Sequence, residues 1–181
     1  MNAENTTPIK KAFILDASAI YNGILSQNLV GFKYVPLCVI DEIQGALRGE
    51  VLLSELSSNK NIIHSTPGKE SILKIKEMAK NTGDLTELSK CDINVLALAL
   101  DIQSNGYQVE IISDDYDIQN LAKTAKIPYR GIYWKGITSV YNYYWECIGC
   151  RKRSSIQIDT CIECGSEMEK KVKKKSSTRK K

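Results

Sequence analysis

The 181-residue chain has 43% hydrophobic and 25% charged residues, which is the composition of an ordinary globular protein. This length suits one domain and a small appendage. The longest apolar run, Val95–Leu100, has six residues, whereas about 20 are needed to cross a bilayer. We therefore expect no membrane span, no signal peptide and a cytoplasmic protein.

The charge is distributed unevenly along the chain. The net charge is +4, but residues 170–181 contain eight Lys or Arg and no acid, so the remainder has 17 basic and 21 acidic residues, or −4. A basic block of this kind predicts a disordered tail, at residues 169–181, that engages a polyanion or merely aids solubility. The acidic body concentrates carboxylates for another purpose, such as metal binding.

Short apolar segments alternate with helical patterns from residue 11 onward. Strands are expected at 11–15, 33–35, 61–63, 109–112 and 127–133, and helices at 17–25, 39–47, 69–80, 89–100 and 116–125. The Ser89–Asp92 segment has a capping-box pattern at the start of its helix. This alternation predicts an α/β fold with a central, mostly parallel sheet flanked by helices.

Four acids fall at, or face, the predicted carboxyl edge of the sheet: Asp16, Glu42, Asp92 and Asp114. Ligands bind beyond this edge in open parallel sheets. Two carboxylates about 4 Å apart repel by roughly 4 kcal/mol at an effective dielectric near 20. If the four meet, divalent cations must compensate them, and oxygen ligands suit Mg²⁺ or Mn²⁺.

Each acid except one also has a local explanation. Asp16 and Asp114 could be helix N-caps, Asp92 the acid of its capping box, and Asp117 the box partner of Asp114. Glu42 lies beside an apolar helical stripe and has no cap to serve. Together the acids favour a metal site. The single histidine, His64, lies in a predicted strand outside these segments and is assigned no catalytic role.

Four of the six cysteines form two C-x2-C pairs separated by ten residues: Cys147, Cys150, Cys161 and Cys164. Four thiolates in this spacing predict a closed, structural Zn²⁺ site. A module this small has too little core to fold without metal. Without a secretory signal disulfides are not expected, so Cys38 and Cys91 are interpreted as packed thiols.

An aromatic-rich segment precedes the cysteine pairs. The expected organisation is a domain at 1–135, an aromatic linker at 136–144, a zinc ribbon at 145–168 and the basic tail. The linker tyrosines either anchor one domain on the other, which we favour, or stack on unpaired bases. Basic residues of the ribbon loop and tail are predicted to bind RNA through counterion release: Arg151, Lys152, Arg153, Lys170, Lys171, Lys173, Lys174 and Lys175.

The acidic segments resemble the successive motifs of the PIN-domain nucleases. They are Ile14-Leu-Asp16-Ala-Ser18, Val35-Pro-Leu-Cys-Val-Ile-Asp-Glu42-Ile, Leu88-Ser-Lys-Cys-Asp92-Ile and Ile112-Ser-Asp114-Asp-Tyr. The resemblance spans residues 10 to 133. It implies that Asp16, Glu42, Asp92 and Asp114 bind Mg²⁺ or Mn²⁺, with Asp115 and Asp117 as alternatives to Asp114. It also implies RNA hydrolysis giving a 3′-hydroxyl and a 5′-phosphate.

A PIN-like domain followed by a zinc ribbon resembles, more narrowly, the Nin-one-binding (Nob) endonucleases that mature the 3′ end of small-subunit ribosomal RNA. This resemblance implies precursor small-subunit rRNA within an immature small ribosomal subunit as substrate. An assembly-factor protein is then a candidate partner. The rival hypothesis is a non-catalytic RNA-binding or ribosome assembly factor whose acids are caps.

Overall fold

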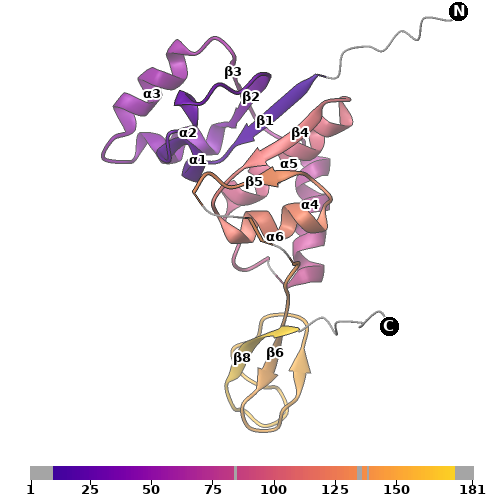
Figure 1. The fold of residues 1–181 in the computed structure, drawn as a ribbon. Helices are drawn as coiled ribbons and strands as arrows, with labels where there is room; N and C mark the ends of the chain where they lie inside the picture. The colour runs from indigo at the N-terminus through magenta and orange to yellow at the C-terminus, as the bar shows by residue number, and fades with distance from the viewer. Residues whose placement is uncertain (1–9, 84, 134–135, 138, 174–181) are drawn as a thin grey trace, which may run out of the picture.

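The computed structural model describes residues 10–83, 85–133, 136–137 and 139–173 of the chain. These residues form two lobes, a larger α/β domain and a small three-stranded unit that hangs from it near the C-terminal end (Figure 1). Among the described residues, no helix has the length and apolar composition that crossing a membrane requires.

The larger domain is built on one parallel sheet. Its strands are β1 (Lys11–Leu15), β2 (Phe32–Pro36), β3 (Ile62–Ser65), β4 (Gln108–Ile112) and β5 (Tyr129–Arg130). Their order is β3-β2-β1-β4-β5, and every neighbouring pair is parallel. The expected α/β fold is therefore confirmed, with β1 in the middle and all carboxyl ends at one edge.

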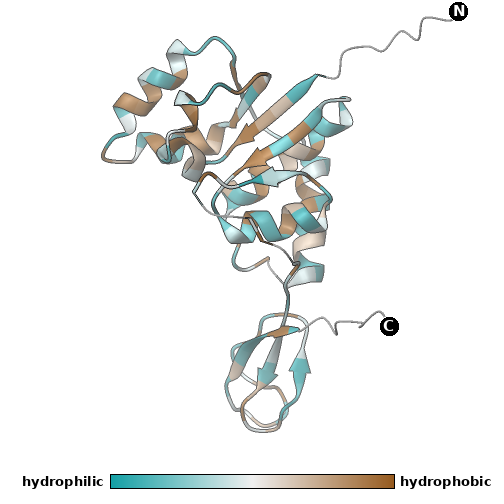
Figure 2. Cartoon of the chain, in the orientation of Figure 1, coloured by the Kyte–Doolittle hydropathy of each residue, from teal (hydrophilic) through white to brown (hydrophobic). Residues whose placement is uncertain are grey.

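Helices connect and cover these strands. They are α1 (Ala17–Tyr21), the 3₁₀ turn η1 (Ile24–Ser26), α2 (Leu37–Gln44), α3 (Gly49–Ser58), α4 (Lys69–Thr82), α5 (Lys90–Ser104) and α6 (Tyr116–Thr124). Helix α5 packs on β1, β2 and β4, and α4 covers α5 (Figure 1). Between these layers lie fully buried residues such as Ile14 and Leu96. In Figure 2, β1 changes from hydrophilic to hydrophobic colouring toward its carboxyl end.

Two helical expectations differ from the structure. The helix expected to reach residue 25 stops at Tyr21, because Gly23 adopts a left-handed backbone with φ of 78° that an α-helix cannot include. Helix α3 was not expected at all. Its Leu52, Leu53 and Leu56 have helical spacing, and this signal could have revealed it.

The expectation that Cys38 and Cys91 are packed thiols is wrong. The two residues form a disulfide with a Cα–Cα distance of 5.6 Å, which lies in the usual range for such bonds. Because α5 crosses the sheet beside β2, the first turns of α2 and α5 come together, although 53 positions separate the cysteines in the sequence. Sequence alone does not display this proximity.

The smaller lobe is an antiparallel sheet with strand order β7-β6-β8. Its strands are β6 (Asn142–Cys147), β7 (Arg153–Ser154) and β8 (Met168–Lys173). Their core contains Trp145, Cys147, Cys161 and Met168. This core is small, as expected for a module that depends on metal.

The observed strands extend beyond the expected ribbon boundaries. Asn142–Tyr144 belong to β6 and not to a linker, and Glu169–Lys173 belong to β8 and not to a disordered tail. The reason is backbone pairing, because Asn142 and Tyr144 lie opposite Lys173 and Lys171. Residues 174–181, including the predicted RNA-binding Lys174 and Lys175, lie outside the described part of the chain.

Candidate active site and zinc-ligand cluster

Asp16 follows β1 directly at the carboxyl edge of the sheet. Its backbone N–H donates to the Ile112 carbonyl at 3.2 Å, which continues the β1–β4 pairing. It occupies the N-cap position of α1, but its side chain makes no capping bond. Instead one oxygen, Oδ2, accepts from the hydroxyls of Ser18 at 2.7 Å and Ser113 at 2.8 Å. The side chain is therefore held in the crevice, and the capping explanation does not apply to it.

The charge of Asp92 acts on Asp16, and the charges of Asp16 and Asp92 both act on Glu42. Burial raises the pKa of Asp16 first, its two serine hydrogen bonds lower it, and the negative charge of Asp92 raises it further. The pKa of Glu42 is raised by burial, then by the charges of Asp16 and Asp92. Helices α2 and α5 thus bring two acids toward the acid that follows β1. The charge effects run from Asp92 to Asp16 and from both of these acids to Glu42.

Asp92 has the local role that its sequence pattern predicted. Its Oδ2 accepts from the backbone N–H of Ser89 at 2.7 Å, and its own N–H donates to the Ser89 hydroxyl at 3.1 Å. This reciprocal pair is a complete capping box at the start of α5. The box also fixes the direction of the carboxylate.

Asp114 is occupied by hydrogen bonds within the domain. Its Oδ1 accepts from the backbone N–H groups of Ile132 at 2.7 Å and Tyr133 at 3.3 Å. Its Oδ2 accepts from the side-chain amide of Asn22 at 2.8 Å. This carboxylate joins the segment after β5 to the segment after α1.

The next two acids have different surroundings. Asp115, and not Asp114, caps α6, because its Oδ1 accepts from the N–H groups of Asp117 and Ile118. The pKa of Asp117 is raised by burial and by the charges of Asp115, Glu87 and Asp92, and the nearby Lys170 lowers it. Asp117 is therefore linked electrostatically to Asp92.

The acids are less tightly gathered than the cysteines. In the described ranges, the group of three or more metal-ligating side chains whose ligand atoms all lie within 4.8 Å of one another consists of Cys147, Cys150, Cys161 and Cys164. Asp16, Glu42, Asp92 and Asp114 do not form such a group. Their carboxylate oxygens are the ligands that hard cations such as Mg²⁺ prefer. In this structure, however, these oxygens are not close enough together to surround one ion.

The cysteine cluster fits zinc. Sγ of Cys147 lies 3.4 Å from that of Cys164, and Sγ of Cys150 lies 3.6 Å from that of Cys161. Four sulfurs about 2.3 Å from one tetrahedral centre would be about 3.8 Å apart. Hydrogen bonds from Ser166 lower the pKa of Cys164 to about 6, which favours the thiolate that a metal requires.

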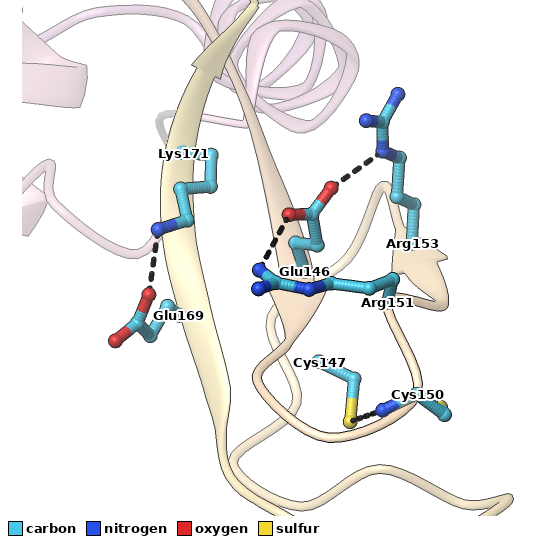
Figure 3. A network of polar contacts seen from close by, with 7 residues as sticks. All are labelled: Glu146, Cys147, Cys150, Arg151, Arg153, Glu169 and Lys171. Atoms are coloured by element: carbon cyan, nitrogen blue, oxygen red, sulfur yellow. Dashed lines mark hydrogen bonds and ion pairs between the residues drawn. The ribbon is translucent and has the colours of Figure 1, made fainter.

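The predicted RNA-binding cations have carboxylate partners within the lobe. Arg153 and Arg151 both approach Glu146, at 2.8 and 3.6 Å, and Lys171 approaches Glu169 at 2.6 Å (Figure 3). Lys152 pairs with Glu163 in the same way. The Lys152–Glu163 and Lys171–Glu169 pairs are exposed on both sides, and such pairs contribute only about 0–1 kcal/mol each. Lys173 ends β8 and is exposed.

Lys170 differs because it contacts the larger domain. Its ammonium lies 2.8 Å from the Glu87 carboxylate and 4.1 Å from the centre of the Tyr143 ring. Asn120 adds a second link, since its side chain accepts from the N–H of Tyr141 and donates to the carbonyl of the same residue. These contacts support the expected anchoring role of the aromatic segment.

A groove of about 590 Å³ lies where the two lobes meet. It is lined by Tyr116, Asp117 and Asn120 of α6, by Gly136 and Ile137, and by Tyr141, Tyr143 and Val172. The rings of Tyr116 and Tyr141 are 54% and 42% exposed, which leaves surface for an incoming planar group. One acid of the edge, Asp117, thus opens directly into an aromatic groove.

Comparison with known proteins decides which family this arrangement represents. Residues 13–102 match the model of a PIN domain of ribonuclease. Endoribonuclease Nob1 of Archaeoglobus fulgidus is 34% identical over 155 residues, covering 85% of this chain and 87% of that protein. The chain belongs to the Nob1 endoribonuclease family. The predicted relationship is confirmed, and nothing in the comparisons favours the rival, non-catalytic hypothesis.

Other members of the Nob1 family extend the comparison over both lobes. The Methanocaldococcus jannaschii Nob1 is 34% identical over 171 residues, covering 92% of this chain and 80% of that protein. A Saccharomyces cerevisiae relative named 20S-pre-rRNA D-site endonuclease is 31% identical over 103 residues, which is 55% of this chain and 22% of the yeast protein. The PIN match ends within α5, so Asp114, Asp115 and Asp117 lie beyond it.

Proposed function

We propose that this protein is a divalent-metal-dependent endoribonuclease that cuts single-stranded RNA. The observation that carries the proposal is that Asp16 directly follows the central strand β1 and that Asp92 and Glu42 lie close enough to be linked to it electrostatically. The charges of Asp16 and Asp92 raise the pKa of Glu42, and the charge of Asp92 raises that of Asp16. Like charges held this way destabilise the fold unless a cation compensates them. Carboxylate oxygens suit Mg²⁺ or Mn²⁺.

The hydrogen bonds around these acids support ligation. Ser18 and Ser113 both donate to Oδ2 of Asp16, and Ser89 donates to Oδ2 of Asp92. Such partners hold carboxylates in a fixed direction, as the partners of metal ligands commonly do. A divalent ion held by these acids would supply Lewis-acid chemistry for the hydrolysis of a phosphodiester bond. By family resemblance, the products carry a 3′-hydroxyl and a 5′-phosphate.

The fourth ligand is proposed to be Asp117 rather than Asp114. Three donors occupy the two oxygens of Asp114, and Asp115 is used as a helix cap. The link between Asp117 and Asp92, and the opening of Asp117 into the groove, support this choice. Asp117→Asn should then weaken Mn²⁺ binding directly. Asp114→Asn should act only by loosening the segment at Ile132.

The groove between the lobes is proposed to take the RNA strand. Exposed rings of Tyr116 and Tyr141 offer stacking surfaces for unpaired bases, which contribute about 1–3 kcal/mol per base in single-strand binding. Elsewhere on the ribbon Arg151, Lys152, Arg153 and Lys171, which pair with carboxylates in the free protein, are proposed to contact phosphates of the bound strand. Zinc, held by the four cysteines, keeps this surface in place.

The proposed substrate is precursor small-subunit rRNA in an immature small ribosomal subunit in the cytoplasm, with an assembly-factor protein as a candidate partner. The name of the yeast relative, 20S-pre-rRNA D-site endonuclease, supports the substrate class. The test is incubation of the purified, zinc-loaded protein with RNAs that span the mature 3′ end, in Mn²⁺ and in Mg²⁺, with both product ends mapped. One specific cut that Asp16→Asn abolishes is the expected result.

A binding measurement separates this proposal from RNA binding without cleavage. Millimolar Mn²⁺ should raise the melting temperature of the wild type and not that of Asp16→Asn, because a ligand that binds only the folded state stabilises it. RNA affinity measured without divalent ions should be the same in both proteins. Equal shifts in the two proteins, or intact cleavage in Asp16→Asn, would contradict the proposed site.

A further inference from the structure

The Cys38–Cys91 disulfide lies at the two helices that carry proposed metal ligands. Cys38 is in the first turn of α2, and Glu42 follows four residues later on the same helix. Residues at this spacing occupy one face of a helix, about one turn apart. Cys91 is in the first turn of α5, and Asp92 is the next residue. The bridge therefore joins the two helices within one turn of Glu42 and within one residue of Asp92.

The electrostatics of the site work against this arrangement. Glu42 and Asp92 are like-charged carboxylates on the contacting helices α2 and α5, so bringing them together around one cation works against their repulsion. Helix α2, which carries Glu42, is only eight residues long. Its Glu42 is exposed, whereas Asp16 is buried and fixed by two serines. Of the three acids, Glu42 has the weakest support from non-covalent contacts.

We infer that the Cys38–Cys91 bridge is a redox-sensitive positioning device that holds Glu42 beside Asp92, so that one divalent cation can be shared. This inference rests on the proposed metal site and goes beyond it. In the bridged protein, α2 cannot move away from α5 under the repulsion of the acids. When the bridge is open, the acids separate in the absence of metal, and binding must first bring them back together.

The redox step is an ordinary thiol–disulfide exchange. Closing the bridge takes an external disulfide: one cysteine thiolate attacks it, and the second then displaces the remaining thiol. Two protein thiols are oxidised to one disulfide, and the external disulfide is reduced to two thiols. A dithiol reductant reverses the step. The two cysteines are partly buried, and the four ribbon cysteines lie in the other lobe.

A disulfide that positions a metal ligand differs measurably from one that only stabilises the fold. A purely stabilising disulfide changes the free energy of unfolding of the domain and leaves the metal affinity of the folded protein unchanged. A positioning bridge changes the affinity itself. In the open form the separated acids must be brought together before Mn²⁺ binds, and the free energy this requires weakens binding. The decisive quantity is therefore the dissociation constant for Mn²⁺, measured where every sample is fully folded.

The experiment uses the full, zinc-loaded chain in three forms: bridged wild type, wild type reduced with a phosphine, and the Cys38→Ser/Cys91→Ser variant. Mn²⁺ binding is measured by titration calorimetry and RNA cleavage is followed across Mn²⁺ concentrations. Opening the bridge should weaken Mn²⁺ binding by roughly tenfold, within the usual range for coupled sites. Cleavage should fall at low Mn²⁺ and recover at saturating Mn²⁺, and the double variant should be insensitive to reductant.

Ser71→Ala is the matched control for lost stability. The buried Ser71 hydroxyl donates to Asp101 between α4 and α5, away from the acids, so its removal should destabilise the domain without changing Mn²⁺ affinity. Equal Mn²⁺ affinity in bridged and open proteins would overturn the inference, even if cleavage and its loss in Asp16→Asn upheld the proposed function. Absence of Mn²⁺ binding in every form would overturn both. Thiols can also be counted in protein that has been purified in air, stripped of zinc and unfolded. Finding all six cysteines as free thiols would refute the bridge.

Discussion

Opening the Cys38–Cys91 disulfide should lower the free energy of unfolding of the α/β domain by about 4 kcal/mol. The two cysteines are 53 positions apart in the sequence. In the chain-entropy description, cross-linking a loop of this size removes about 14 cal/mol/K from the unfolded ensemble, or about 4 kcal/mol at 25 °C. A typical domain has only about 5–15 kcal/mol of stability in total, so the change is large.

The assay is urea denaturation followed by the helical circular-dichroism signal, which reports the larger domain because the smaller lobe has no helix in its described residues. Zinc is kept in the buffer, and a phosphine reductant is used. Reduced wild type and the Cys38→Ser/Cys91→Ser variant should lose the same stability, and the variant should not respond to reductant. A loss under about 1 kcal/mol in both would refute the reasoning, because most surface changes already fall near that size.

Three further predictions concern other parts of the molecule. Cys150→Ser should reduce bound zinc from one per chain to almost none and abolish amide-exchange protection in β6 and β8, leaving that of β1 and β4 unchanged. Without divalent ions, Asp16→Asn should be more stable than wild type at pH 7. Because burial raises the pKa of Asp16, the folded state binds that proton more tightly than the unfolded state. The difference in unfolding free energy should therefore shrink as pH falls toward the ordinary value of 3.8, and a constant difference would contradict the shift. Lys170→Glu should slow RNA cleavage by up to about fivefold, the equivalent of the ~1 kcal/mol of an exposed ion pair, and adding Glu87→Lys should restore part of the rate. If the double variant is as slow as the single one, Lys170 acts on RNA and not through Glu87.

Local chemistry explains what could be predicted about the fold. The capping box of Ser89 and Asp92 joins residues three apart, so its sequence pattern was sufficient. Helix α3 shows the limit of this reasoning. Its helical spacing of apolar residues is present in the sequence. However, Val51 is exposed and Leu53 only partly buried, so the apolar face is poorly defined. Packing against α2 stabilises the helix in the folded protein.

The strand boundaries of the ribbon depended on partners remote in sequence. A run of lysines from residue 170 has the composition of a disordered tail. It forms β8 because β6 offers a ladder of backbone groups to pair with, and because Lys170 meets Glu87 on the other lobe. Composition describes the solvent preference of a segment and says nothing about an available neighbour.

The sequence by itself determined the alternating α/β fold, three acids at the carboxyl edge and the four-cysteine cluster, because strand period, helix spacing and C-x2-C spacing are set over a few residues. Only the tertiary structure decided that Asp114 is occupied by Ile132, Tyr133 and Asn22, and that Cys38 meets Cys91. The physical reason is sheet order: with β1 between β2 and β4, segments from distant parts of the chain converge at one edge. Which of them touch depends on how the elements pack.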